Sequence, residues 1–62
     1  MDTSREIRYY GIIEHAGRPA EVLVVRQGGR QVSQTLTGVT YRTDRDAYAD
    51  NARKNRALHS AA

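Results

Sequence analysis

The chain has 62 residues, no cysteine and a net charge of +3 from 10 basic and 7 acidic side chains. A chain of this length forms one domain with a small core, and the absence of cysteine excludes disulfide bonds as a source of stability. The longest uninterrupted apolar run, residues 22–25, is much shorter than the ~18 residues of a membrane-spanning helix, and no apolar stretch of signal-peptide type begins the sequence. We therefore expect one small cytoplasmic domain over residues 1–62, frayed at residues 1–4 and 60–62, with no membrane association.

Positive charge is concentrated in the second part of the sequence. Residues 1–25 carry three arginines and four acidic side chains, whereas residues 26–62 carry seven basic and three acidic side chains. Nine of the ten basic residues are arginine, whose planar guanidinium suits bidentate contacts with phosphate or carboxylate better than lysine does. This composition is typical either of an ordinary solvated surface or of a surface for an anionic partner.

Two segments in the first half are predicted to be β-strands. Residues 5–15 are rich in β-branched and aromatic side chains. Gly11 within this segment is typical of a β-bulge, which would also explain why neither face of the strand is cleanly polar. Residues 20–27 form the strongest strand candidate, with five apolar residues interrupted only by Glu21 over residues 20–25, which indicates a central strand covered at least partly on both faces.

Turn sequences separate these strands from each other and from a third one. Residues 16–19, Ala-Gly-Arg-Pro, predict a turn, and Gly28-Gly29 predicts a two-residue hairpin of type I′ or II′. The third strand, residues 30–37, ends at Gly38, and residues 39–42 continue as a short extended segment. Its side chains alternate, with Val32, Gln34 and Leu36 on one face and, on a wet face, Gln31, Ser33, Thr35 and Thr37.

A helix is predicted for residues 44–58. Thr43 and Asp46 approximate a capping box, and the acidic residues of the first turn and the basic residues near the end follow the order that the helix dipole favours. Asp50 and Lys54 have the i,i+4 spacing of an ion pair. The predicted apolar stripe is thin and is interrupted by two asparagines; its members are Ala47, Tyr48, Ala52 and Leu58, and the interruptions are Asn51 and Asn55.

These elements predict an α+β domain of β-β-β-α order. Short connections favour a three-stranded antiparallel β-meander, with the C-terminal α-helix packed on one face. The other face is then left to solvent, to a second copy or to a ligand.

No group of residues indicates catalysis. The sequence has no nucleophile-elbow motif and no phosphate-binding loop, because Gly28-Gly29-Arg30 is followed by a strand and not by a helix. His15 and His59 are expected to be surface imidazoles, and each of the aspartates in residues 44–50 has a capping or ion-pair role. We therefore predict a protein that is not an enzyme and that holds neither a metal nor a cofactor.

The second hairpin is the candidate recognition element. A two-stranded ribbon can enter the major groove of DNA, where arginine pairs with guanine and glutamine with adenine. Side chains of these types lie on the hairpin, and further basic side chains follow it that could contact phosphates; the full predicted set is Arg26, Arg30, Gln31, Ser33, Thr35, Arg42, Arg53 and Lys54. The other interpretation is that the polar side chains simply solvate an outer sheet face.

Residues 20–56 resemble the arm-type N-terminal DNA-binding domain of tyrosine recombinases, the phage integrases. The similar pieces are a strand at residues 22–26, the hairpin Gly28-Gly29-Arg30, a strand at residues 32–36 and the aromatic-x-Thr-x-x-x-Ala pattern of residues 41–47. The resemblance implies a three-stranded sheet packed on a helix, with the sheet entering the major groove. Arg26, Arg30 and Gln31 would then contact DNA. The sequence departs from the family in its few aromatic strand residues and in an extra link at residues 38–40.

A different class of function is also open. A small protein without cysteine, of the kind that phages and mobile elements encode, could bind and inhibit a host protein. Tyr9 and Tyr10 would be its anchors, because tyrosine is enriched at interface hot spots and adjacent strand residues point to opposite faces. A free sheet edge could in addition pair with a second copy to give a homo-oligomer.

Overall fold

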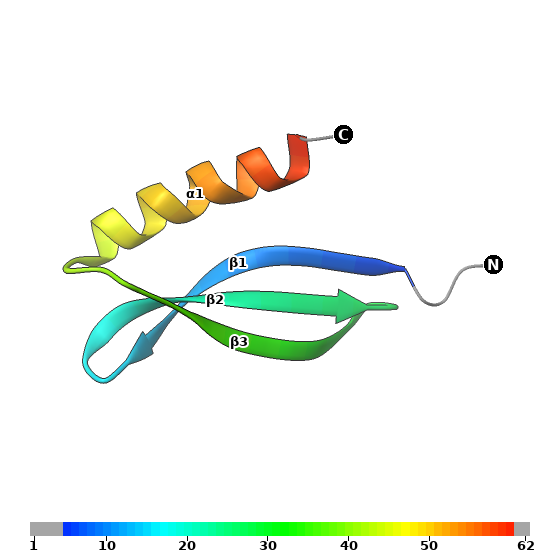
Figure 1. Ribbon diagram of the computed structural model, residues 1–62, viewed down its shortest axis with the longest axis horizontal. Helices are drawn as coiled ribbons and strands as arrows, with labels where there is room; N and C mark the ends of the chain where they lie inside the picture. The colour runs from blue at the N-terminus through cyan, green and yellow to red at the C-terminus, as the bar shows by residue number, and fades with distance from the viewer. Residues whose placement is uncertain (1–4, 61–62) are drawn as a thin grey trace.

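The computed structural model describes residues 5–60, which form a three-stranded antiparallel sheet followed by one helix (Figure 1). The strands are β1 (Glu6–His15), β2 (Arg18–Gln27) and β3 (Arg30–Thr40), in the order β1-β2-β3, and the helix is α1 (Asp44–Ser60). The predicted β-β-β-α meander is thus confirmed. The fraying expected for residues 1–4, 61 and 62 lies outside the described residues, whereas Ser60 is the last residue of the helix.

Both hairpin turns are two residues long and have positive φ at both positions. The φ angles are 54° and 78° for Ala16 and Gly17, and 60° and 84° for Gly28 and Gly29. Two consecutive positive φ values are the signature of type I′ turns, whose twist matches that of the flanking strands. The first turn is tighter than predicted, because the two residues after Gly17 already belong to β2.

The pairing of β1 with β2 runs without interruption from Glu6↔Gln27 to His15↔Arg18. The bulge predicted at Gly11 is therefore wrong. Gly11 lies opposite Val22, and a Cβ atom built on it would stand 3.4 Å from a Val22 methyl group and 3.6 Å from a Val24 methyl group. The glycine thus allows the two valines to pack closely over β1 while the strand stays regular.

The irregularities lie in β3. One extra residue, Val32, separates the pairs Arg26↔Gln31 and Val25↔Ser33. A longer irregularity separates Val22↔Leu36 from Ala20↔Thr40, so residues 37–39 all lie opposite Glu21. Gly38, with a φ of 96°, makes this bend possible. The strand therefore does not end at Gly38, as predicted, but continues to Thr40.

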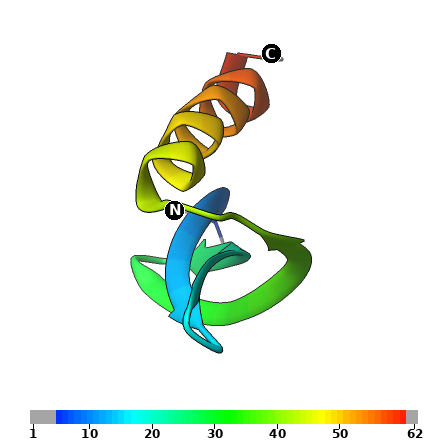
Figure 2. The ribbon, with the colours of Figure 1, turned by 90° about the vertical axis from the view of Figure 1, so that its left-hand side faces the viewer.

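The buried residues lie mainly on the central strand. Ala20, Val22 and Val24 are buried on one face of β2, while Glu21 is buried on the other face, so the prediction that this strand is covered on both faces is confirmed. The helix packs on β1 and β2. All residues of β3 are exposed, and most of this strand lies farther from the helix than β1 does, although its end leads up to the start of α1 (Figures 1 and 2).

Helix α1 contacts the sheet mainly through polar side chains. Of the predicted apolar stripe only Ala47 is buried; Ala52 is exposed, and Tyr48 and Leu58 are 58% and 40% exposed. The stripe prediction is otherwise wrong, because the helix runs along the outer edge of β1, where backbone groups need hydrogen-bond partners. The two asparagines taken as interruptions, Asn51 and Asn55, provide those partners.

The outer edge of β1 is closed by three side chains spaced four residues apart on α1. The Tyr10 amide donates to Asn55 Oδ1 at 2.7 Å, and the Tyr10 carbonyl accepts from Asn55 Nδ2 at 2.9 Å and from Asn51 Nδ2 at 2.8 Å. His59 Nε2 lies 3.0 Å from the Arg8 carbonyl oxygen. Asn55 therefore hydrogen-bonds to Tyr10 much as the backbone of a fourth strand would.

Candidate nucleic-acid interface

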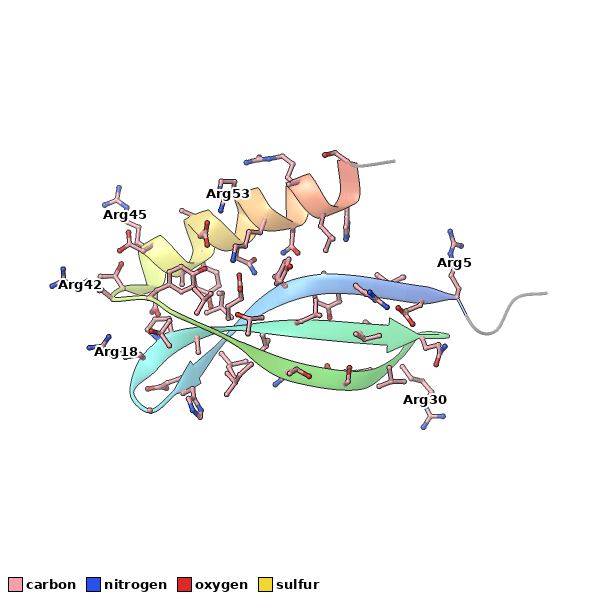
Figure 3. The ribbon with its side chains drawn as sticks, in the orientation of Figure 1. Arg5, Arg18, Arg30, Arg42, Arg45 and Arg53 are labelled. Carbon is pink, nitrogen blue, oxygen red and sulfur yellow. The ribbon has the colours of Figure 1, made fainter. Side chains whose placement is uncertain are left out.

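The net charge of the described residues is concentrated at one end of the molecule, which we call the hairpin end. It comprises residues 5–8, residues 26–30 and the C-terminal part of α1, whose His59 and Leu58 lie beside residues 5–8. Figure 3 shows Arg5 and Arg30 extending from this end into solvent. Glu6, paired with Arg8, is the one acidic side chain among these residues. Five basic side chains stand here, namely Arg5, Arg8, Arg26, Arg30 and Arg56.

The opposite end, which we call the loop end, is electrically neutral. It comprises residues 14–18 and 42–48, where three arginines are matched by three acidic residues: Arg18, Arg42, Arg45, Glu14, Asp44 and Asp46. Labelled arginines at this end point away from the body of the molecule (Figure 3). A groove of about 530 Å³ lies between the first turn and the start of the helix, lined in part by Arg18, Arg42 and the exposed Tyr48. Because the acidic residues neutralise this end, it presents a weaker field to an anion than the hairpin end does.

Between the two ends lies a set of four charged residues paired with each other, which we call the central group: Glu21, Asp50, Arg53 and Lys54. The buried Glu21 carboxylate accepts hydrogen bonds from Lys54 Nζ at 2.8 and 3.1 Å and from the Thr37 hydroxyl at 2.7 Å. Lys54 Nζ also lies 5.4 Å from the centroid of the Tyr10 ring. The hydrogen bond to Glu21 raises the pKa of Lys54. The bend of β3 at residues 37–39 places Thr37 within reach of the carboxylate.

Asp50 joins the helix to the segment that precedes it. It accepts a hydrogen bond from the Tyr41 hydroxyl and two from the Arg53 guanidinium, at 2.6 and 3.1 Å. The Tyr41 bond and then the Arg53 bonds lower the pKa of Asp50. Desolvation and the bond to Asp50 raise the pKa of Tyr41. The predicted Asp50–Lys54 pair is present at 3.8 Å, but Glu21 is the closer partner of Lys54.

The eight predicted nucleic-acid contacts do not form one surface. Arg53 and Lys54 are held by acidic side chains in the central group, and Arg42 lies at the loop end, far from Arg30 (Figure 3). Arg26 and Arg30 are at the hairpin end, where the Arg26 guanidinium donates to the Gly29 carbonyl at 2.6 Å. The hairpin end thus contains only part of the predicted set of DNA contacts, because the residues on the helix and at the loop end lie away from it.

The prediction that Gln31, Ser33 and Thr35 share a face is wrong. Gln31 pairs with Arg26 and Ser33 pairs with Val25, and consecutive residues of β2 point to opposite faces. The extra residue Val32 causes this change of side. Gln31 therefore lies on the face of Arg26, where its amide is 3.5 Å from the Gln34 side chain, and Ser33 and Thr35 lie on the other face.

The two tyrosines of the alternative hypothesis are both half-buried. Tyr10 lies on the helix side of the sheet, beside Lys54, and its ring is already in contact. Tyr9 pairs with Val24 and lies on the opposite face. Of the two predicted anchors, Tyr9 is the one left on a face that the helix does not cover.

Sequence reasoning missed Arg5, Arg8 and Arg56 as neighbours of the hairpin. They come from β1 and from the end of α1, far from residues 26–30 in the sequence. One signal was present: in an antiparallel meander the start of the first strand lies beside the second turn, and the Gly28 amide indeed donates to the Arg5 carbonyl at 3.2 Å. The charges of residues 5–8 should therefore have been added to those of the hairpin.

Comparison with known proteins gives no match: no family model fits the sequence, and no curated protein or solved structure is detectably similar. The resemblance to integrase arm-binding domains therefore stays a prediction. Among the described residues, no helix is long and apolar enough to cross a membrane.

Proposed function

We propose that the protein is a non-enzymatic binding module that contacts duplex DNA through the hairpin end. The supporting observation is the sorting of charge: the loop end and the central group are neutral, so the net positive charge of the described residues resides at the hairpin end. Phosphate contacts supply most of the affinity of proteins for nucleic acid, and arginine is well suited to make them.

The shape of this end fits the same role. The type I′ turn at Gly28-Gly29 joins β2 and β3 in a tight hairpin, with the start of β1 beside the turn, and the major groove, about 12 Å wide, admits a two-stranded ribbon. Arg30 extends from the tip. Arg5, Arg8 and Arg56 come from β1 and α1, on the β1 side of the hairpin, where they could contact phosphates along one side of a groove. In this arrangement Gln31 is placed for a base edge and the five arginines for phosphates of the DNA backbone.

Binding can be tested by fluorescence anisotropy of a labelled DNA duplex titrated with protein between about 50 and about 200 mM salt. Contacts from all five basic side chains predict a slope of log K against log salt near −4.5, at about −0.9 per phosphate. The double variant Arg5→Ala/Arg30→Ala is expected to reduce the magnitude of this slope by about 2.

A matched control removes the same charge from the other end. Arg18→Ala/Arg42→Ala lowers the net charge equally but leaves the hairpin end intact, so DNA affinity should change little. Equal losses in both double variants would show a non-specific charge effect and contradict a local interface. No binding at low salt with micromolar protein would refute the proposal.

Binding of a host protein is a second proposal, supported by a different feature. Ile7 and Leu36, which are 49% and 44% exposed, share a sheet face with Tyr9 on the side away from the helix. Capture of a partner from nuclease-treated lysate that is lost in Tyr9→Ala but retained in Arg5→Ala/Arg30→Ala would favour this alternative over DNA binding.

A further inference from the structure

The two outer edges of the sheet differ in how they are covered. On β1, Asn51, Asn55 and His59 contact the outward-facing backbone groups of Tyr10 and Arg8. The helix does not pack on β3, all of whose residues are exposed. Closing one edge and leaving the other open makes β3 the available site for addition of another strand.

The pairing pattern identifies the β3 groups that point outward. The Tyr10 amide and carbonyl point away from β2, so Tyr10↔Leu23 is a pair without mutual hydrogen bonds, and Leu23 directs its backbone groups toward β3. Thr35, opposite Leu23, therefore bonds to β2. Its neighbours Gln34 and Leu36 must direct their amides and carbonyls toward the open edge.

The composition of this edge favours a second copy of the same chain. Edge strands usually resist pairing through charged residues or proline, but residues 31–41 contain neither. An antiparallel partner with the same sequence therefore meets no like charge over this segment. The bulge at Val32 and the bend at residues 37–39 limit regular pairing to the short segment between them.

We propose that the protein forms a two-fold homodimer by antiparallel pairing of β3 with β3 of a second copy, centred on Thr35. This register places Thr35 opposite Thr35 of the second copy and Gln34 opposite Leu36. Each Gln34–Leu36 pair exchanges two backbone hydrogen bonds, and the combined sheet has six strands. The exposed Leu36 side chains of the two copies lie diagonally across the junction on one face, where they shield each other from water.

Introducing a charged residue of either sign at Thr35 tests the proposed β3–β3 register directly. Thr35→Lys and Thr35→Glu each place like charges opposite each other at the two-fold axis, so each variant should dimerise at least about tenfold more weakly than the wild type. An equimolar mixture of the two should form a heterodimer. Ala49→Lys, on an exposed helix position, adds the same charge as Thr35→Lys and should leave dimerisation unchanged.

Sedimentation equilibrium over a range of protein concentrations measures each outcome, and circular dichroism confirms that each variant is folded. A wild-type protein that stays monomeric at all concentrations would overturn the proposal. So would a folded Thr35→Lys variant that dimerises as tightly as the wild type, or a mixture that forms no heterodimer. The inference does not rest on DNA binding, and no nucleic acid enters the test.

Discussion

Replacing Asn55 with alanine tests whether α1 is held by polar contacts with the edge of β1. In Asn55→Ala the Tyr10 amide loses its partner at 2.7 Å, while the Tyr10 carbonyl keeps the bond from Asn51 at 2.8 Å. The substitution removes no large apolar group from the core. Its effect on stability therefore reports on the two hydrogen bonds of Asn55 to Tyr10 and, to a smaller extent, on its longer bond to Asn51 at 3.3 Å.

The magnitude can be worked out from these contacts. An unsatisfied backbone amide costs about 1–3 kcal/mol when buried, and the lower half of that range applies to the half-buried Tyr10. The second lost bond, to a carbonyl that keeps another donor, adds about 0.5 kcal/mol. Alanine gains roughly 0.5 kcal/mol over asparagine in helix propensity. We expect a net loss of about 1–2 kcal/mol, a large part of the ~3–5 kcal/mol available to a domain of this size.

Urea unfolding followed by circular dichroism measures the loss, and hydrogen exchange at the Tyr10 amide locates it. Protection of that amide should fall more than the protection of amides in β2. Arg56→Ala, at the adjacent exposed position, is the control and should shift the urea midpoint little. A stability loss below about 0.5 kcal/mol in Asn55→Ala, or unchanged protection at Tyr10, would refute the assigned role of these bonds.

Three further substitutions address the central ion pair, the alkaline limit of stability and the first turn. Lys54→Met should lower the free energy of unfolding by about 2–3 kcal/mol, which is less than for a fully buried pair because the Lys54 side chain is 27% exposed. Adding Glu21→Gln to this variant should restore at least half of the lost stability. An additive double-mutant cycle in urea unfolding would contradict this coupling. Because the folded-state pKa of Tyr41 is raised, this residue contributes stability below about pH 10 that is lost as the pH rises further. Tyr41→Phe should therefore make the urea midpoint less sensitive to pH above about pH 10. An equally steep fall in the variant would show that the bond from Tyr41 to Asp50 is not responsible. Ala16→Asn should raise the thermal midpoint, gaining about 0.5–1 kcal/mol, because asparagine tolerates the φ of 54°, and a lower midpoint would contradict a strained turn.

The order of elements could be predicted because each signal is local. Gly28-Gly29 specifies a tight turn by itself, and Thr43 caps the helix through its hydroxyl, which accepts the Asp46 amide at 3.1 Å. Such signals depend only on neighbouring residues. They fixed three strands and a helix close to their observed bounds, with α1 extending two residues beyond the predicted Leu58.

The docking of the helix and the faces of β3 could not be predicted in the same way. Asn51 and Asn55 bind the backbone of Tyr10, and backbone groups leave no trace in the sequence. The bulge at Val32 also has no marker, since valine fits a regular strand equally well, yet it moves Gln31 to the opposite face. Glu21 did carry a signal, because an acidic residue within an apolar strand needs a buried partner.

The location of charged partners separates residues that hold the fold from residues available to a ligand. Lys54 and Arg53 are bonded to acidic side chains, so removing them changes stability before it changes any binding surface. Arg5 and Arg30 extend into solvent, and removing them should leave the fold nearly unchanged. A count of basic residues treats these side chains alike. Only those that extend into solvent, such as Arg5 and Arg30, contribute strongly to the electrostatic field at a distant anion, because paired opposite charges largely cancel. For a chain with so small a core, the hairpin end and the open edge of β3 are therefore the surfaces where substitutions can alter partners without unfolding the protein.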